Sequence, residues 1–202
     1  GNDYSYDTNG NLTSDLNKGI PTGGISYNHL NLPTSITLPG GMITYTYDAT
    51  GVKLRKVAGS TTTDYASGFI YENNNLKQFS QPEGYVEPDG SGWQYVYQYK
   101  DIWGNTRITY ADDDNSGGIT SSEIRREQNY YPFGLEHKGY NNYSYGAKNN
   151  LKTYQGQEFI EDLGLNTHEW KYRMSDPSIG RFWQIDPLAE DYTYNSTYAF
   201  QE

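Results

Sequence analysis

The stretch Tyr4-Ser-Tyr-Asp7-Thr-Asn-Gly10-Asn-Leu12 sets the pattern on which this fold is built. Degenerate copies follow at roughly 20-residue intervals, as in a repeat architecture. The copies read Tyr27-Asn28-x-x-Asn31-Leu32, Tyr45-Thr-Tyr47-Asp48-x-x-Gly51-x-Lys53-Leu54 and Tyr71-Glu72-x-x-Asn75-Leu76. We therefore expect one structural unit to recur along this part of the chain.

Each copy predicts one β-hairpin. An Asp or Asn at the first turn position can accept a hydrogen bond from the backbone N–H two residues on, and the Gly that follows tolerates a left-handed conformation. Alternating Tyr and Thr suit the strands on either side, where Tyr at every second position stacks on one face. A two-stranded hairpin is not stable alone, so successive units must pair into one continuous sheet.

The composition also favours an all-β protein. Of 202 residues, 34% are hydrophobic, and much of the apolar surface comes from 22 Tyr, 6 Phe and 4 Trp. Together with 22 Gly, this is typical of short strands and tight turns, because a helical or α/β core usually needs more aliphatic residues. Within this pattern, residues 80–92 are rich in Gly, Pro and acidic side chains and predict a polar hairpin loop or small insertion.

Charge, hydropathy and cysteine content exclude several classes. The formal net charge is −10 and no cluster of Lys and Arg exceeds the length of Arg125-Arg126, so no basic surface for nucleic acid is expected. No apolar run approaches the ~20 residues that a membrane-spanning helix needs. The absence of Cys excludes disulfides and thiol catalysis. The chain begins at Gly1 and shows no signal segment, which favours a fragment of a longer polypeptide.

Residues 112–123 match a twelve-position calcium loop. Side-chain oxygens fall at positions 1, 3, 5 and 9, a backbone carbonyl at position 7, Gly117 at position 6 and a Glu at position 12. Ca²⁺ prefers six to eight oxygen ligands, and this spacing lets a loop wind around the ion. The predicted ligands are Asp112, Asp114, Ser116, Gly118, Thr120 and Glu123.

The flanks of this loop differ from the helices of an EF-hand. Residues 107–110 before it and residues 127–131 after it have the composition of strands. The sequence therefore predicts a β-hairpin that structural Ca²⁺ clamps. The alternative is an acidic hairpin loop that is simply solvated.

The repeats resemble the YD repeat of the rearrangement hot spot (RHS) family, which includes the C components of insecticidal toxin complexes and, more distantly, the teneurins. Residues 101–105 are similar to a fifth turn, and residues 130–134 and 154–158 resemble segments of the RHS-associated core. The longest match is Arg173-Met-Ser175-Asp176-Pro-Ser-Ile-Gly180-Arg181-Phe182-Trp-Gln-Ile-Asp186-Pro-Leu-Ala-Glu190. In it Ser175 replaces the usual Tyr, and the Leu-Ala-Glu ending is similar to a variant common in Bacteroidota.

This resemblance implies a β-spiral shell that encloses a C-terminal toxin or effector and is plugged at one end by the core domain. Together with the calcium-type loop predicted above, it divides the chain into YD-repeat hairpins at 1–110, the calcium-binding hairpin loop at 111–124 and the core domain at 125–202. The implied partners are the upstream repeats and the effector of the same polypeptide, with secretion machinery and surface glycans as further candidates. The implied setting is a bacterial protein that is secreted or held at the cell surface.

The resemblance also implies aspartyl self-cleavage, with Asp176 and Asp186 as the catalytic acids and Arg173 as their charge partner. Two carboxyls that share a site split their pKa values, so one can activate water while the other protonates the leaving amide. The alternative is structural, because Asp before Pro commonly starts a turn. The family's later cleavage motif does not occur before Glu202, so we do not expect this segment to cleave itself.

A second function class stays open: a surface adhesion or carbohydrate-binding module, in which exposed Tyr and Trp rings stack on sugars. Aromatic side chains that face inward or stack between strands favour the shell. A solvent-facing patch of Trp93, Trp103 or Trp183 favours binding.

Overall fold

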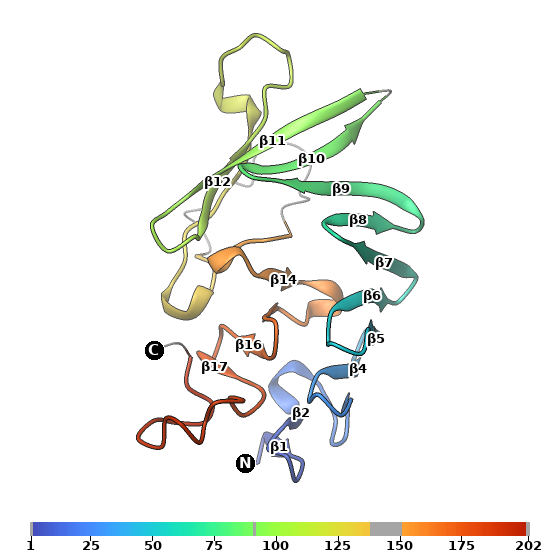
Figure 1. The fold of residues 1–202 in the computed structure, drawn as a ribbon, viewed down its shortest axis with the longest axis vertical. Coiled ribbons are helices and arrows are strands. Elements are labelled where there is room, and N and C mark those ends of the chain that lie inside the picture. Colours follow the sequence, from blue (N-terminus) through green and yellow to red (C-terminus); the bar gives the residue numbers. More distant parts are fainter. Residues whose placement is uncertain (1, 91, 138–150, 201–202) are drawn as a thin grey trace. The chain divides into compact units, whose positions relative to one another are not determined.

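The computed structural model describes residues 2–90, 92–137 and 151–200 (Figure 1). Regular structure in these residues is β-strand or short 3-10 helix, which confirms the all-β prediction. The chain clusters into two compact units. Unit 1 comprises Gly1–Thr63 and Phe159–Glu202, and unit 2 comprises Asp64–Glu158.

The secondary structure begins with a long series of strands. These are β1 (Tyr4–Tyr6), β2 (Leu12–Asp15), β3 (Ile25–Tyr27), β4 (Pro33–Leu38), β5 (Gly41–Tyr47), β6 (Lys53–Ala58), β7 (Thr61–Ala66), β8 (Phe69–Glu72), β9 (Asn75–Gln81), β10 (Gly84–Asp89), β11 (Gly92–Lys100), β12 (Thr106–Tyr110) and β13 (Ile124–Glu127). Four short strands follow: β14 (Glu158–Ile160), β15 (Thr167–Glu169), β16 (Met174–Asp176) and β17 (Arg181–Phe182). The 3-10 helices are η1 (Leu16–Lys18), η2 (Ser121–Glu123), η3 (Pro132–Gly134), η4 (Tyr154–Gly156) and η5 (Asp162–Gly164).

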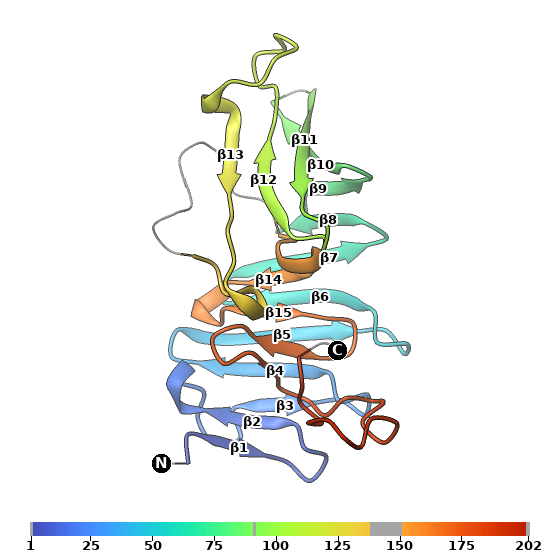
Figure 2. The ribbon, with the colours of Figure 1, turned by 90° about the vertical axis from the view of Figure 1, so that its left-hand side faces the viewer.

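Strands that are neighbours in the sequence are neighbours in the sheets. β1 pairs with β2, strands β3 to β13 form an eleven-stranded sheet in sequence order, and β14 to β17 form a four-stranded sheet in sequence order. Figure 2 shows β1 to β6 of unit 1 as successive rungs. The repeats therefore do build consecutive hairpins, and those after the first lie in one continuous sheet.

The repeated turn has the predicted chemistry. Oδ1 of Asp7 accepts hydrogen bonds from the backbone N–H groups of Asn9, at 2.9 Å, and of Asn11, at 2.8 Å. Three other turns begin with Asn28, Asp48 and Asp101. In each of them Oδ1 of that first residue accepts hydrogen bonds from the backbone N–H groups two and four residues later. Gly10 lies at φ 77°, and Asn31 takes the equivalent place in the second copy at φ 58°.

A β-bulge accompanies each of these turns. The pairing register shifts beside the residue that precedes the turn, at Tyr6, Tyr27, Tyr47 and Lys100. A bulge adds one residue to one strand and increases the local twist. One acceptor side chain and one left-handed residue therefore fix both the loop length and the register of each hairpin.

The fourth copy forms its hairpin with a different turn. Glu72 pairs directly with Asn75, and the two residues between them, Asn73 and Asn74, lie at φ 50° and 64°. Two successive left-handed residues give the tight connection that matches the twist of a hairpin. Asn tolerates this conformation, whereas Glu lacks the short side chain that closes the other turns.

Two predictions from the sequence were wrong in detail. Residues 80–92 are not one hairpin loop, because the segment contains β10, which pairs with β9 and β11. Its Tyr85 and Glu87 side chains are buried, and Glu87 forms an ion pair with Arg125 that neutralises the charge. The strand after the calcium-type loop, expected at residues 127–131, is instead β13, which begins at Ile124 and ends at Glu127.

Each unit has its own apolar core. In unit 1 the side chains of Ile20, Ile36, Ile43 and Trp183 are almost fully buried within a larger cluster of strand residues. Unit 2 has a smaller cluster of Tyr85, Val96 and Ala111. The core of unit 1 thus includes Trp183 from the long RHS-like motif, which places that motif against the repeat hairpins of the same unit.

Candidate functional site

The RHS-like motif contains the β16–β17 hairpin of the four-stranded sheet, and β15 leads into it. β15 turns into β16 through a backbone hydrogen bond from Trp170 N to Arg173 O at 2.9 Å. β16 pairs with β17, and the backbone N–H of Leu12 in β2 donates to the carbonyl of Trp183 at 3.0 Å. These contacts fix the positions of the predicted acids within unit 1.

Of the two acids that the resemblance assigned to Arg173, Asp186 lies beside it. Nη2 of Arg173 is 2.6 Å from Oδ2 of Asp186, and Oδ1 of Asp186 accepts the backbone N–H of Leu188 at 2.8 Å. The guanidinium stacks on the Phe182 ring, 3.7 Å from its centroid. Burial lowers the pKa of Arg173, and the nearby Asp186 carboxylate opposes that shift.

Asp186 is accessible from two hollows of unit 1. One, of about 270 Å³, has Arg173, Tyr192 and Ser196 among its lining residues. The other, of about 370 Å³, lies beside the repeat turns and the Tyr172 side chain. The Asp186 side chain is 32% exposed, so a ligand can reach its carboxylate.

Asp176 has a different environment. Its side chain is 1% exposed, and Oδ2 lies 3.0 Å from Nζ of Lys18. Oδ1 accepts the backbone N–H of Ser178 at 2.8 Å and its hydroxyl at 2.6 Å. Each predicted acid thus has its own cation, Lys18 for Asp176 and Arg173 for Asp186. All the hydrogen bonds on Asp176 are those of a turn closer and a buried ion pair.

Asp15 is a buried acid that the sequence analysis missed. Its side chain caps η1 by accepting from the backbone N–H groups of Asn17 and Lys18. Burial raises the pKa of Asp15, the two N–H groups oppose that shift, and the Asp176 carboxylate adds to it. His168 is also buried, and burial lowers its pKa to about 4. The local signals for this capped turn are Asp15 at the N-cap and Gly19, at φ 71°, at the C-cap.

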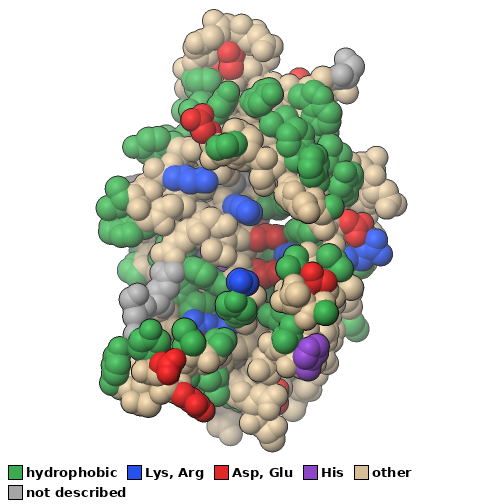
Figure 3. All heavy atoms as spheres, in the orientation of Figure 1, with side chains coloured by type: hydrophobic (Ala, Val, Ile, Leu, Met, Phe, Trp, Pro, Cys, Tyr) green, Lys and Arg blue, Asp and Glu red, His purple; other side chains and the backbone are tan. Residues whose placement is uncertain are grey.

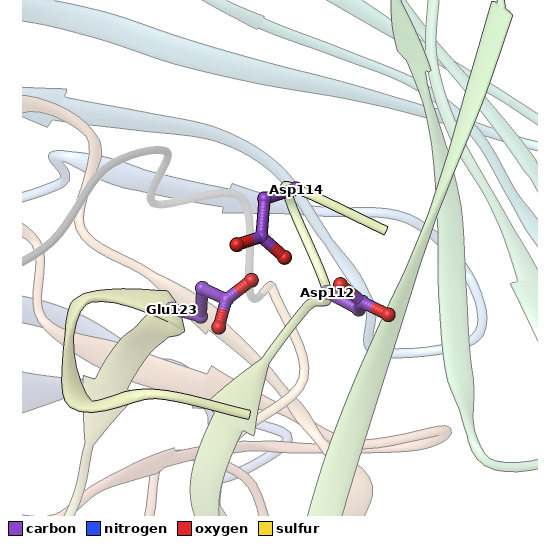
Figure 4. Close-up of side chains that lie close together, drawn as sticks. All are labelled: Asp112, Asp114 and Glu123. Carbon is purple, nitrogen blue, oxygen red and sulfur yellow. The ribbon is translucent and has the colours of Figure 1, made fainter. Parts of the chain in front are cut away.

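The calcium-type loop brings together the three acids at its positions 1, 3 and 12. Carboxylate oxygens of Asp112, Asp114 and Glu123 all lie within 4.8 Å of one another, and Figure 4 shows how these side chains converge. The backbone N–H of Ser116 donates to Oδ1 of both Asp residues at 2.9 Å. Position 5 of the loop thereby fixes the carboxylates of positions 1 and 3.

The other predicted ligands are tied to this group. The Ser116 hydroxyl donates to the Gly118 carbonyl at 3.2 Å, and Thr120 donates to Glu123 through its N–H and hydroxyl, both at 2.8 Å. The bonds from Thr120 lower the pKa of Glu123, and those from Ser116 lower the pKa of Asp114. Both carboxyls are therefore favoured in the charged form that a cation needs.

Asp113 points out of this acidic group. Its Oδ1 lies 2.6 Å from Nη2 of Arg125, and the same guanidinium pairs with Glu87 of β10. Oε1 of Glu123 accepts the Asp113 backbone N–H at 2.9 Å. The loop is thus attached to the sheet of unit 2 through Asp113, which lies between two predicted ligands, and through Arg125, which follows the loop.

The tryptophans divide between the two predicted environments. Trp183 is 1% exposed and belongs to the core of unit 1, whereas Trp93 and Trp103 are 57% and 68% exposed. Trp93 packs edge-on against Phe79, with 5.6 Å between ring centroids. Figure 3 shows hydrophobic side chains gathered over β10 and β11. The exposed aromatics therefore favour neither function class alone.

In the described residues, no helix has the length and apolarity to cross a membrane.

Comparison with known proteins extends the fold assignment. No family model matches the chain. Salivary gland surface protein 1 of Aedes aegypti is 24% identical over 213 residues, which cover 96% of this chain and 6% of that protein. A Photorhabdus luminescens Tc holotoxin pore structure matches with a TM-score of 0.61 and 16% identity, across 96% of this chain and 10% of that one.

Two further crystal structures match to a similar degree. TcdB2-TccC3-Cdc42 has a TM-score of 0.60 and covers 96% of this chain, and TcdB2-TccC3-TEV has 0.59 and covers 98%, each at 17% identity. The chain spans 10% and 12% of those chains. These likenesses show that the chain has the RHS-like, all-β fold of the shell in Tc toxins.

Proposed function

We propose that this chain is part of an RHS shell that encloses an effector carried on the same polypeptide. The observation that carries the proposal is the structural likeness to Tc toxin chains over nearly the whole of this chain. The series of repeat hairpins and the motif that docks against them in unit 1 support it. The partners are then the neighbouring repeats and the effector, and the protein is secreted or held at the cell surface.

Limited proteolysis of the full-length protein tests encapsulation. An enclosed effector is expected to survive a protease concentration that digests the same effector expressed alone. Fractionation of the native host tests the location, with the protein expected in the medium or on the cell surface. Equal digestion of the enclosed and free effector would contradict the shell function.

We further propose that Asp186 and Arg173 take part in self-cleavage, whereas Asp176 holds the fold. Asp186 is the acid that lines a hollow, so its carboxylate can reach water and a peptide bond. The Arg173 guanidinium keeps a buried Nη1 with no hydrogen-bond acceptor among the described residues. Nη2 of the same guanidinium lies 2.6 Å from the Asp186 carboxylate and so fixes the orientation of the acid.

Intact-mass analysis of full-length variants tests this assignment. Asp186→Asn is expected to abolish the C-terminal fragment, while Asp191→Asn, on the same segment and exposed, keeps it. Lys18→Met combined with Asp176→Asn removes the charges of the buried pair and is expected to retain cleavage if it folds. Fragment release from Asp186→Asn would contradict the role of Asp186.

We also propose that residues 112–123 bind structural Ca²⁺. The convergence of the Asp112, Asp114 and Glu123 carboxylates supports this ion, with Ser116, Gly118 and Thr120 completing an all-oxygen set. Calorimetric titration after removal of Ca²⁺ with EGTA is expected to show binding that Asp114→Asn weakens. Asp89→Asn, an exposed acid on β10, is the matched control. No heat and no change in Tm on adding Ca²⁺ would contradict the site.

A further inference from the structure

The hollow of about 370 Å³ in unit 1 lies where two kinds of turn meet. The tip of the β15–β16 hairpin contributes Lys171 and Tyr172 to its wall. The turns of the first three repeat copies contribute Asn9, Asn31 and Thr50. Its volume falls in the ~300–1,000 Å³ range of small-molecule sites. The shell function proposed above makes no use of this hollow beyond Asp186.

Side-chain amides form one wall of this pocket. Oδ1 of Asn31 accepts from Nδ2 of Asn9 at 3.3 Å and from Nδ2 of Asn11 at 2.9 Å. Within the described residues, the Asn31 NH₂ group and the Asn9 carbonyl oxygen make no hydrogen bond. The wall therefore presents a free donor beside a free acceptor, held in place by the hydrogen bonds between the two amides.

An aromatic ring forms another part of the wall. Tyr172 is 55% exposed although it lies beside Leu30, Leu32 and Ile185, which also line the pocket. Nζ of Lys171 lies over the ring, 4.8 Å from its centroid. One face of the ring is thus covered by the cation, and a ligand that stacks on Tyr172 uses the opposite face.

The charges of the pocket favour a neutral ligand. Asp186 is already paired with Arg173, which leaves the Lys171 ammonium as the one formal charge of the described lining without an opposite partner. A phosphate or polyanion usually needs several cations or a bidentate Arg. A neutral ligand needs hydrogen-bonding groups on its rim and an apolar face, and both are offered here.

We propose that this pocket binds a neutral saccharide. Each hydroxyl of a sugar both donates and accepts a hydrogen bond. It can therefore accept from the Asn31 NH₂ group and donate to the Asn9 side-chain oxygen. The C–H face of a pyranose ring is apolar and flat enough to stack on Tyr172. A peptide offers a donor and an acceptor as well, but its backbone has no apolar face of its own to stack on Tyr172, so a capped peptide serves as the competing ligand in the test.

Calorimetry with maltose, cellobiose, lactose and N,N′-diacetylchitobiose tests the proposal on the whole chain. At least one of these sugars is expected to bind with a Kd of about 1 mM or tighter. Tyr172→Ala is expected to weaken that binding by roughly tenfold, and Tyr172→Phe to keep it, because the ring supplies the contact. Asn9→Ala is expected to weaken it as well.

Tyr99→Ala is the matched control, because Tyr99 is 64% exposed and lies in unit 2. Circular dichroism of each variant checks that the fold is retained. The proposal is overturned if none of the four sugars binds, if Tyr172→Ala binds like the wild type, or if a neutral capped tetrapeptide binds the same residues more tightly than every sugar. The test is independent of cleavage, so the shell function and the saccharide site can fail separately.

Discussion

Replacing Lys18 with Met tests what holds the first hairpin of unit 1 to the RHS-like motif. The Lys18 ammonium lies 3.0 Å from the Asp176 carboxylate and donates to the Leu165 carbonyl at 2.9 Å. The Lys18 and Asp176 side chains are only 12% and 1% exposed. Met keeps the length and apolar stem of Lys, so the substitution removes the charge and leaves Asp176 buried without its cation.

The expected loss follows from that burial. Removing one partner of a buried ion pair costs about 3–5 kcal/mol, because the other charge stays buried and unpaired. The two donors from Ser178 stay on Asp176, so we expect the lower end of the range, about 3 kcal/mol. For a chain of this size that loss lowers Tm by about 6–12 °C.

Urea unfolding followed by tryptophan fluorescence measures the change, because Trp183 reports on the core of unit 1. Lys171→Met, at an exposed lysine, is the control and is expected to change little. The double variant with Asp176→Asn should recover much of the loss, since both charges are then gone. A loss below about 1 kcal/mol for Lys18→Met, or fully additive losses in the double variant, would refute the reasoning.

Three further predictions concern single side chains. Asp7→Ala removes the acceptor that closes the first repeat turn and is expected to cost about 1–2 kcal/mol in urea unfolding, whereas Asp7→Asn keeps the acceptor, as Asn28 does. Burial raises the pKa of Asp15, so its ionisation opposes folding as the pH rises through that pKa. Asp15→Asn should therefore melt above the wild type at pH 7, and this difference should shrink near the ordinary Asp pKa of 3.8. Burial lowers the pKa of His168 to about 4. Between pH 6.5 and 4 unfolding therefore takes up a proton, and the free energy of unfolding decreases as the pH falls through that window. An NMR titration in which the His168 ring titrates near pH 6.5 would contradict its burial.

The repeat hairpins were predictable because their information is local. An Asp or Asn and a residue that tolerates positive φ lie within five positions of each other, so the turns at Asp7, Asp48 and Asp101 follow from the sequence alone. β10 was not predictable in this way. The charge of Glu87 indicates a solvated loop until its distant partner Arg125 is known.

In the candidate site, too, contacts within one motif were predictable from the sequence and contacts between distant segments were not. The Arg173–Asp186 pair lies within one motif, and the sequence predicted that these residues act together. The partner of Asp176 is 158 positions away in the chain, at Lys18, and no pattern near either residue points to the other. The orphan nitrogen of Arg173 and the amide wall at Asn31 likewise depend on packing between distant segments.

The turns of the repeats have a consequence for how the chain acquires its structure. In each hairpin the residues that fix the loop length and the register lie within about five positions, so the hairpin can form before later residues are synthesised. Each new hairpin can then pair with the edge strand of the hairpin before it. A ribosome that releases such a chain supplies the strands in the order in which the sheet uses them. Pairs between distant segments, such as Lys56 with Asp162 and Lys18 with Asp176, must wait until residues 158–190 emerge, so docking of that segment is the step that depends most on long-range contacts.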